Sequence, residues 1–179
     1  AIGREAGKNA RPDGYTLVCA SSSAMTVLPA IRKNMPYDPV NDFAYIGNFA
    51  IFPNVLVVNP QMPVRNVKEL VEFARANKGK VNMASAGVGS TSHLAGVILT
   101  QMGGFEALHV PHKGGGPSVA SVVAGETHFT FAPAPAAMSQ VKAGRLRAIG
   151  HSLPSRSAML GDMPAVNETL PGYDYSTWA

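Results

Sequence analysis

From residue 81 onward, short apolar runs alternate regularly with segments of helical length. Each apolar run has the length of a buried strand, and each intervening segment is long enough for a helix that crosses back over a sheet. The expected strands are residues 81–84, 107–110, 128–131 and 146–151, and the expected helices are residues 92–102, 117–124 and 135–143. Neighbouring parallel strands need such crossover segments, so the pattern predicts an α/β fold with a parallel sheet.

The chain before residue 81 shows the same kinds of element with less regularity. Residues 55–58 form an apolar β-branched run, which predicts another strand. Apolar side chains then recur at helical spacing over residues 67–74, which predicts an amphipathic helix. Residues 43–51 are expected to be extended, residues 25–32 helical, and residues 1–10 the end of a helix.

A further strand is expected at residues 15–20, after the turn signal Asp13-Gly14. Cys19 lies within this apolar run, and we expect it to be a small buried side chain rather than a reactive thiol. It is the chain's single cysteine, which excludes an internal disulfide and a zinc site built from cysteines.

Composition narrows the class of protein. The chain has 179 residues, of which 46% are hydrophobic, which suits one domain or two small lobes. The net charge of +4 is scattered and aromatic residues make up only 7%, so the basic stripe of a nucleic-acid-binding module is missing. No apolar run approaches the roughly 20 residues that cross a bilayer, and no export signal is visible.

The run Ser-Ala-Gly-Val-Gly-Ser-Thr-Ser-His at residues 85–93 follows one expected strand and opens the next helix. Gly87 and Gly89 permit backbone conformations that other residues disfavour, and the hydroxyls that follow them can cap the helix. The first amides of a helix have no partner inside it, so this position suits a carboxylate or a phosphate. The residues alone leave two interpretations open, an anion-binding turn or a tight turn with helix caps.

A second glycine-rich turn, Val-Pro-His-Lys-Gly-Gly-Gly-Pro at residues 110–117, follows the next expected strand. His109 and His112 flank its proline, but a third ligand of matching type is missing at that spacing, so no metal site is predicted. His93 is a candidate base, ligand donor or structural link between the turn and a neighbouring strand. The structural role is favoured, because no acidic residue lies nearby in the sequence to orient the ring.

Residues 85–95, the 110–117 turn and the segment Val-Lys-Ala-Gly-Arg-Leu-Arg-Ala-Ile at residues 141–149 together resemble the Bug family. These proteins are the extracytoplasmic solute-binding receptors of tripartite tricarboxylate transporters. The resemblance extends from Arg-Pro-Asp-Gly-Tyr-Thr-Leu at residues 11–17 to Leu-Pro-Gly-Tyr at residues 170–173. Family members begin with an export signal and an extra strand and loop, and continue past residue 179, so the chain is expected to be an internal fragment.

The resemblance implies a two-lobed periplasmic-binding fold in which each lobe is a small α/β unit and the ligand binds between the lobes. Residues 1–53 are expected to form part of the first lobe, residues 54–149 the second lobe, and residues 150–179 the return into the first. It implies hinges near residues 53–55 and 149–152. The implied function is capture of a small organic acid in the periplasm and its delivery to the membrane components of the transporter, without a cofactor, a nucleic-acid partner or insertion into the membrane.

The resemblance also implies which residues bind the acid. The expected ligand-binding residues are Ser21, Ser22, Ser23, Asn54, Ser85, Gly87, Gly89, Ser90, Thr91, Gly114 and Gly115. The alternatives are helix caps for the serines and a turn role for Asn54. His93 and His112 are expected either to have a structural role or to contact the ligand. His112 replaces a tyrosine that the family usually carries, and Ala132 replaces a common acidic residue, which makes an amino-acid ligand less favourable.

The alternative class is a phosphotransfer or hydrolytic enzyme that uses the glycine-rich turn as an anion site. A nucleophile elbow needs Gly-x-Ser-x-Gly, and the second glycine is missing after Ser90. A nucleotide-hydrolase phosphate loop needs a lysine after its last glycine, and Gly89 is followed by Ser90 and Thr91. The sequence therefore favours a binding protein over an enzyme.

Overall fold

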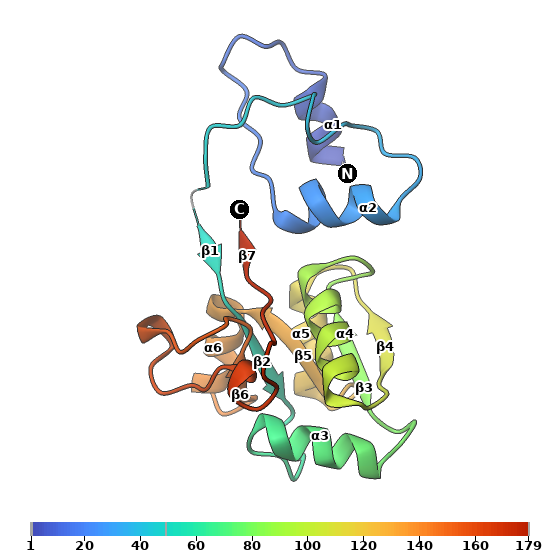
Figure 1. The fold of residues 1–179 in the computed structure, drawn as a ribbon, viewed down its shortest axis with the longest axis vertical. Coiled ribbons are helices and arrows are strands. Elements are labelled where there is room, and N and C mark those ends of the chain that lie inside the picture. The colour runs from blue at the N-terminus through green and yellow to red at the C-terminus, as the bar shows by residue number, and fades with distance from the viewer. Residues whose placement is uncertain (1, 49, 179) are drawn as a thin grey trace. The chain divides into compact units, whose positions relative to one another are not determined.

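The computed structural model describes residues 2–48 and 50–178 (Figure 1). Contacts divide the chain into two compact units. One unit comprises the residues up to Ile51 together with those from Thr177 on, and the other comprises Phe52–Ser176.

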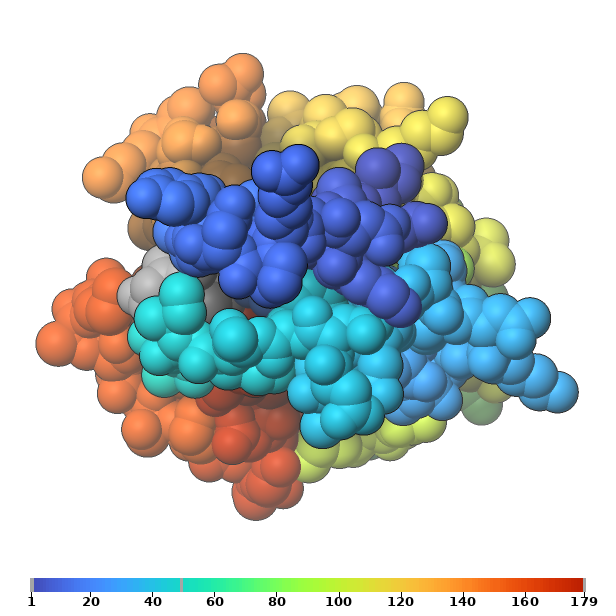
Figure 2. Space-filling view, turned by 90° about the horizontal axis from the view of Figure 1, so that it is seen from above, coloured from blue at the N-terminus to red at the C-terminus, as the bar shows by residue number. Residues whose placement is uncertain are grey.

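The first unit is built from short helical segments and long irregular connections. Its helical elements are α1 (Ile2–Lys8), the π-helical η1 (Ser23–Val27) and α2 (Leu28–Ile31). The buried Tyr37 side chain holds the unit together, because its hydroxyl donates to the Ala24 carbonyl at 2.6 Å. Lys8 Nζ lies 2.9 Å from Asp42 Oδ2, which ties α1 to the segment after residue 40. Figure 2 shows these blue and cyan segments side by side at the surface.

The strand expected at residues 15–20 is wrong. This segment has no ladder partner among the residues that the structure describes, and the side chain of Tyr15 is 92% exposed. A strand needs a hydrogen-bonded neighbour and a buried face, and this segment has neither. Cys19 is accordingly exposed rather than buried. Within residues 43–51, Phe49 lies outside the described residues, and of the others only Ile51 belongs to a strand. This strand is β1 (Ile51–Phe52), which pairs with β7 (Thr177–Trp178).

The second unit contains a five-stranded sheet in the order β4-β3-β5-β2-β6. The strands are β2 (Asn54–Val58), β3 (Asn82–Ser85), β4 (Leu108–Pro111), β5 (Phe129–Pro133) and β6 (Arg147–His151). The parallel arrangement predicted from the alternation is present for β3 with β4 and for β3 with β5. β2 lies outside that alternation and is antiparallel to β5 and to β6, so the sheet is mixed. The helix that follows β2 leads to β3, which is not a neighbour of β2 in the sheet. This connection therefore does not require β2 to be parallel to the strands beside it.

Helices cover both faces of this sheet, which makes three layers (Figure 1). The helices are α3 (Val67–Ala76) and α4 (Thr91–Gly103) on one face, and α5 (Gly115–Ala124) and α6 (Ala134–Lys142) on the other. Along β2, Leu56 and Val58 face the first pair of helices, whereas Val55 and Val57 face the second pair. Successive side chains of a strand point to opposite faces, so a strand between two helical layers is apolar throughout.

Residues 150–176 pack in the second unit and not in the first, so this part of the division differs from the expected one. The segment contains two short 3₁₀ helices, η2 (Ala158–Leu160) and η3 (Val166–Glu168). The fully buried Tyr173 stacks on Phe131 with ring centroids 6.1 Å apart, and its hydroxyl donates to the Ala95 carbonyl at 2.9 Å. The two units meet in the sequence at residues 51–52 and 176–177, whereas the expected hinges lie at residues 53–55 and 149–152.

Candidate functional site

The carboxyl ends of the parallel strands and the beginning of β2 share one edge of the sheet. Ser85 at the end of β3 pairs in register with Pro111 at the end of β4. Asn54 at the start of β2 pairs with Pro133 at the end of β5. Both glycine-rich turns therefore leave the sheet at this edge, which is where open α/β sheets bind their ligands.

The backbone of the first turn depends on its two glycines. Gly87 has a φ of 123° and Gly89 a φ of 76°. Residues other than glycine rarely adopt such positive φ values, because their Cβ clashes with the backbone. Ser90 is the N-cap of α4, and its hydroxyl accepts from the His93 amide at 3.3 Å. The turn thus delivers the chain directly into the first turn of a 13-residue helix.

Two serine hydroxyls are used inside this turn. Ser85 Oγ accepts from the Gly87 amide at 3.1 Å, and Ser92 Oγ accepts from the Ala86 amide at 2.9 Å. Ser85 is fully buried, so its hydroxyl stabilises the turn from the protein interior. Ser85 is one of the expected ligand-binding residues, and the contacts of its hydroxyl are with the turn itself and with His109.

Three amides of the first turn remain as free donors. Within the described parts of the chain, no acceptor contacts the amides of Val88, Thr91 or Ser92. Thr91 and Ser92 occupy the first two positions of α4, where a helix supplies no acceptor of its own. These amides and the positive end of the helix dipole together favour a negatively charged group.

The second turn lies directly against the first. The amide of His112 donates to the Ser85 carbonyl at 2.9 Å, and a Cβ added to Gly87 would lie 3.4 Å from the His112 carbonyl oxygen. Gly114 is the N-cap of α5, and Gly115 is the first residue of that helix. Gly114 and Gly115 therefore lie at the same edge of the sheet as the first turn, at the start of α5.

Two histidines hold the first turn against β4. His93 Nδ1 accepts from the Gly89 amide at 3.2 Å, and the His93 ring stacks on that of His109 with centroids 4.0 Å apart. His109 Nε2 lies 2.6 Å from Ser85 Oγ. Burial lowers the pKa of His93. It also lowers the pKa of His109, and the neighbouring imidazoles of His93 and His112 lower it further.

The contact between His109 and Ser85 is not among the expectations above, where His109 appears only as a possible metal ligand. The position of His109 two residues before the end of β4 nevertheless offers a signal. Its side chain shares a sheet face with that of Pro111, which pairs with Ser85. This signal can be used only when the pairing register of β3 and β4 is known, and the sequence alone does not reveal that register.

The other expected site residues divide between the two units. The Asn54 amide donates to Ser152 Oγ at 3.1 Å, and the Ser152 amide donates back to the Asn54 carbonyl at 2.9 Å, so Asn54 anchors the start of β2 to the segment after β6. Ser21, Ser22 and Ser23 belong to the first unit, where they lie at the beginning of η1. Their part in a common site stays a prediction.

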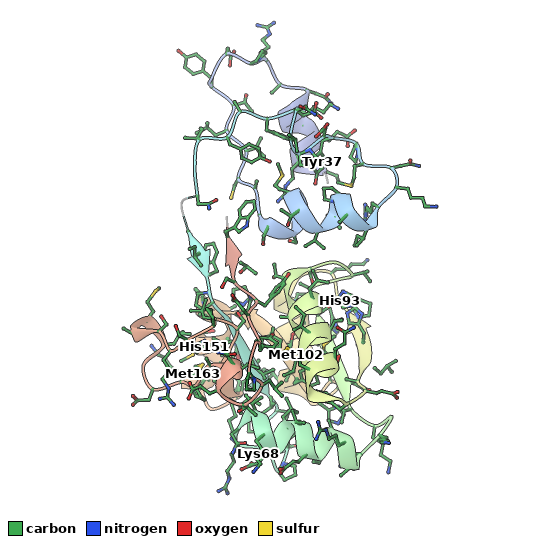
Figure 3. The ribbon with its side chains drawn as sticks, viewed as in Figure 1. Tyr37, Lys68, His93, Met102, His151 and Met163 are labelled. Carbon is green, nitrogen blue, oxygen red and sulfur yellow. The ribbon has the colours of Figure 1, made fainter. Side chains whose placement is uncertain are left out.

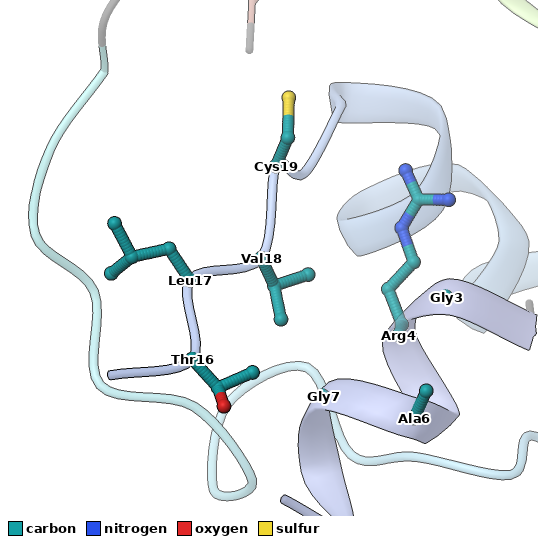
Figure 4. A pocket seen from close by; sticks show the side chains of 8 residues that line it. All are labelled: Gly3, Arg4, Ala6, Gly7, Thr16, Leu17, Val18 and Cys19. Atoms are coloured by element: carbon teal, nitrogen blue, oxygen red, sulfur yellow. The ribbon is translucent and has the colours of Figure 1, made fainter. Parts of the chain in front are cut away.

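The first unit also contains a hollow of about 270 Å³ between α1 and residues 16–19 (Figure 4). None of its lining residues belongs to the expected site. In residues 2–48 and 50–178, no three His, Cys, Asp or Glu side chains are placed to hold a metal ion. None of the helices in these ranges is both long and apolar enough to cross a membrane.

Comparison with known proteins decides the family. Residues 1–179 match the model of the family described as "Tripartite tricarboxylate transporter family receptor", TctC. The chain belongs to this family. The resemblance drawn from the two glycine-rich turns is thus confirmed, and because the family consists of transporter receptors, the enzyme alternative is set aside.

Individual relatives agree with this assignment. The UPF0065 protein in the tcbD–tcbE intergenic region of Pseudomonas sp. (strain P51) is 33% identical over 179 residues, which cover 99% of this chain and 53% of that protein. A solved R. palustris protein, Rpa4515 with adipate, is 29% identical with a TM-score of 0.94, and a solved periplasmic transporter is 38% identical with a TM-score of 0.91. Each comparison covers 99% of this chain and 60% of the solved one. The chain thus spans about half to three fifths of these relatives.

Proposed function

We propose that this receptor binds a small organic acid by its carboxylate in the periplasm and delivers it to the membrane components of a tripartite transporter. The observation that carries the proposal is the pair of unpartnered amides of Thr91 and Ser92 at the start of α4. The similarity to a solved protein that holds adipate supports an acid as the ligand, and the periplasmic names of the solved relatives support the compartment.

Within the proposed site, different residues have different tasks. The amides of Thr91 and Ser92 and the Thr91 hydroxyl contact the carboxylate, while Gly87 and Gly89 give the turn its shape. Hydrogen bonds to a charged acceptor contribute about 1.5–3 kcal/mol each, so a few neutral donors give firm but reversible binding. The remaining expected residues, Ser21, Ser22, Ser23, Asn54, Ser85, Ser90, Gly114 and Gly115, complete or support the site.

The charges of the two turns favour acids without an ammonium group. Residues 85–93 and 110–117 contain His93, His112 and Lys113 but no acidic side chain. Ala132, which lies in β5 at the same sheet edge, is likewise uncharged. An ammonium group would lose its hydration here without gaining a carboxylate partner. Organic acids without an ammonium group, such as adipate, are therefore the preferred class, and binding needs no cofactor because the ligand is released unchanged.

A matched pair of ligands tests this proposal. Glutarate and glutamate share the same two carboxylates and differ by one ammonium group. Thermal-shift and calorimetric titrations of the full-length gene product with adipate, glutarate, glutamate, glucose and ATP are expected to show stabilisation by adipate and glutarate, with much weaker binding of glutamate. Stabilisation by ATP alone, or by none of the acids, would contradict the proposal.

A further inference from the structure

Three imidazoles gather beside the first turn, and the proposed function gives them no role. His93 lies at the start of α4 (Figure 3), His109 lies in β4, and His112 follows β4. The stacked rings of His93 and His109 are inclined by only 21°. An imidazole next to an anion site matters because its cation would add a positive charge there.

The hydrogen bond of His93 fixes its protonation state. Its Nδ1 atom accepts from the Gly89 amide at 3.2 Å, so Nδ1 carries no proton and the neutral ring is protonated on Nε2. A second proton would have to enter Nδ1, where it would face the amide proton of Gly89. His93 can therefore become charged only when the turn opens at Gly89.

His109 has no such restriction, because its partner is a hydroxyl. Ser85 Oγ lies 2.6 Å from His109 Nε2 and 3.3 Å from the Gly87 carbonyl oxygen, and it accepts from the Gly87 amide. A hydroxyl donates one proton and accepts two. It can thus donate to a neutral His109, or accept from a charged His109 while donating to the Gly87 carbonyl, and the turn keeps its shape in both states.

The surroundings keep His109 neutral while the site is empty. Burial and the neighbouring imidazoles of His93 and His112 all disfavour its cation. Lys113 follows in the exposed second turn and adds a charge of the same sign, whereas Glu106 precedes β4 at the far end of that strand. A carboxylate bound at the turn would supply the negative charge that this cluster lacks.

We propose that His109 takes up one proton from solution when a carboxylate binds to the turn of residues 85–92, so that the acid is held together with that proton. The inference rests on the proposed function. The proton enters Nε2, the unprotonated nitrogen of the neutral ring, and Nε2–H then donates to Ser85 Oγ. The Ser85 hydroxyl proton turns from His109 to the Gly87 carbonyl, and the bond from the Gly87 amide to Ser85 Oγ stays. Since ligand and proton favour each other's binding, affinity rises as the pH falls, by at most about tenfold per pH unit for one linked proton.

Calorimetry in buffers of different ionisation enthalpy measures this uptake directly. Titrations of the full-length gene product with adipate at pH 6.5–8 are expected to show buffer-dependent heats that correspond to uptake of up to one proton. In the variant His109→Gln, which keeps a neutral donor and acceptor for Ser85, adipate should still bind, and the uptake and the pH dependence of affinity should be lost.

His128→Gln is the matched control. His128 Nδ1 accepts from the Asn82 amide at 3.0 Å, and burial lowers the pKa of His128 as it does that of His109. Asn82 begins β3, so this histidine lies at the opposite edge of the sheet from Ser85. The control should keep the uptake of the unmodified protein.

The possible outcomes separate the two proposals. If no organic acid binds, the proposed function is wrong and this inference with it. If adipate binds with heats that do not depend on the buffer, or if His109→Gln keeps the uptake, only the inference is overturned.

Discussion

Replacing Gly89 by alanine tests the link between the shape of the first turn and ligand affinity. Gly89 has a φ of 76°, in the left-handed region. An L-residue there costs about 1–2 kcal/mol, because its Cβ approaches the following carbonyl oxygen. The variant must either keep the strained turn or let the peptide rotate, which breaks the bond from the Gly89 amide to His93 Nδ1.

Rotation at Gly89 also displaces the start of α4, and with it the amides that we propose as carboxylate donors. Each hydrogen bond to a charged acceptor contributes about 1.5–3 kcal/mol. Since about 1.4 kcal/mol corresponds to a factor of ten in affinity, loss of one bond weakens binding about tenfold to a hundredfold. Loss of the Thr91 and Ser92 amides together would weaken it further.

Gly79→Ala is the matched control for this substitution. Gly79 has a φ of 72° and no heavy atom within 4 Å of an added Cβ, and it lies in the turn between α3 and β3, away from the candidate site. We expect urea denaturation to give a similar loss of about 1–2 kcal/mol for both variants. Calorimetric titration with adipate should show weaker binding for Gly89→Ala alone. Equal affinity of both folded variants would refute the proposed role of the turn.

Two further predictions concern stability. The change Tyr173→Phe removes the hydrogen bond to the Ala95 carbonyl but keeps the ring on Phe131, so urea denaturation should show a loss of about 0.5–1.5 kcal/mol, and an unchanged free energy of unfolding would contradict it. Burial lowers the pKa of His128, so the unfolded chain binds protons more readily, and stability should fall as the pH drops below about 6.5 toward the lowered pKa. His128→Gln should reduce this dependence, measured as Tm against pH, and an unaltered curve would exclude the assignment.

The sequence specified the local elements of the second unit well. The helices around residues 67–74 and 92–102 and the strands around residues 55–58 and 81–84 lie close to their predicted positions. Hydrophobic period, helix caps and glycine turns arise within a few neighbouring residues, so a single sequence contains these signals. The position of Ser90 as the N-cap of α4 is of this kind.

Residues 15–20 show where such local signals fail to predict secondary structure. Its apolar run has the composition of a strand, yet the described part of the chain provides it with no pairing partner. Strand propensity measures how well side chains fit a pleated, half-buried surface, and that surface has to be supplied by other segments. The exposed Cys19 follows from the same cause.

The sequence by itself determined the helices, the two anion-suited turns and the family, because each depends on residues that are neighbours along the chain. Only the tertiary structure decided the antiparallel direction of β2 and the packing of residues 150–176 against the second unit. It also decided the contact of His109 with Ser85, 24 residues apart. Such contacts depend on strand register and on which surfaces meet, and they become fixed only when distant segments pack together.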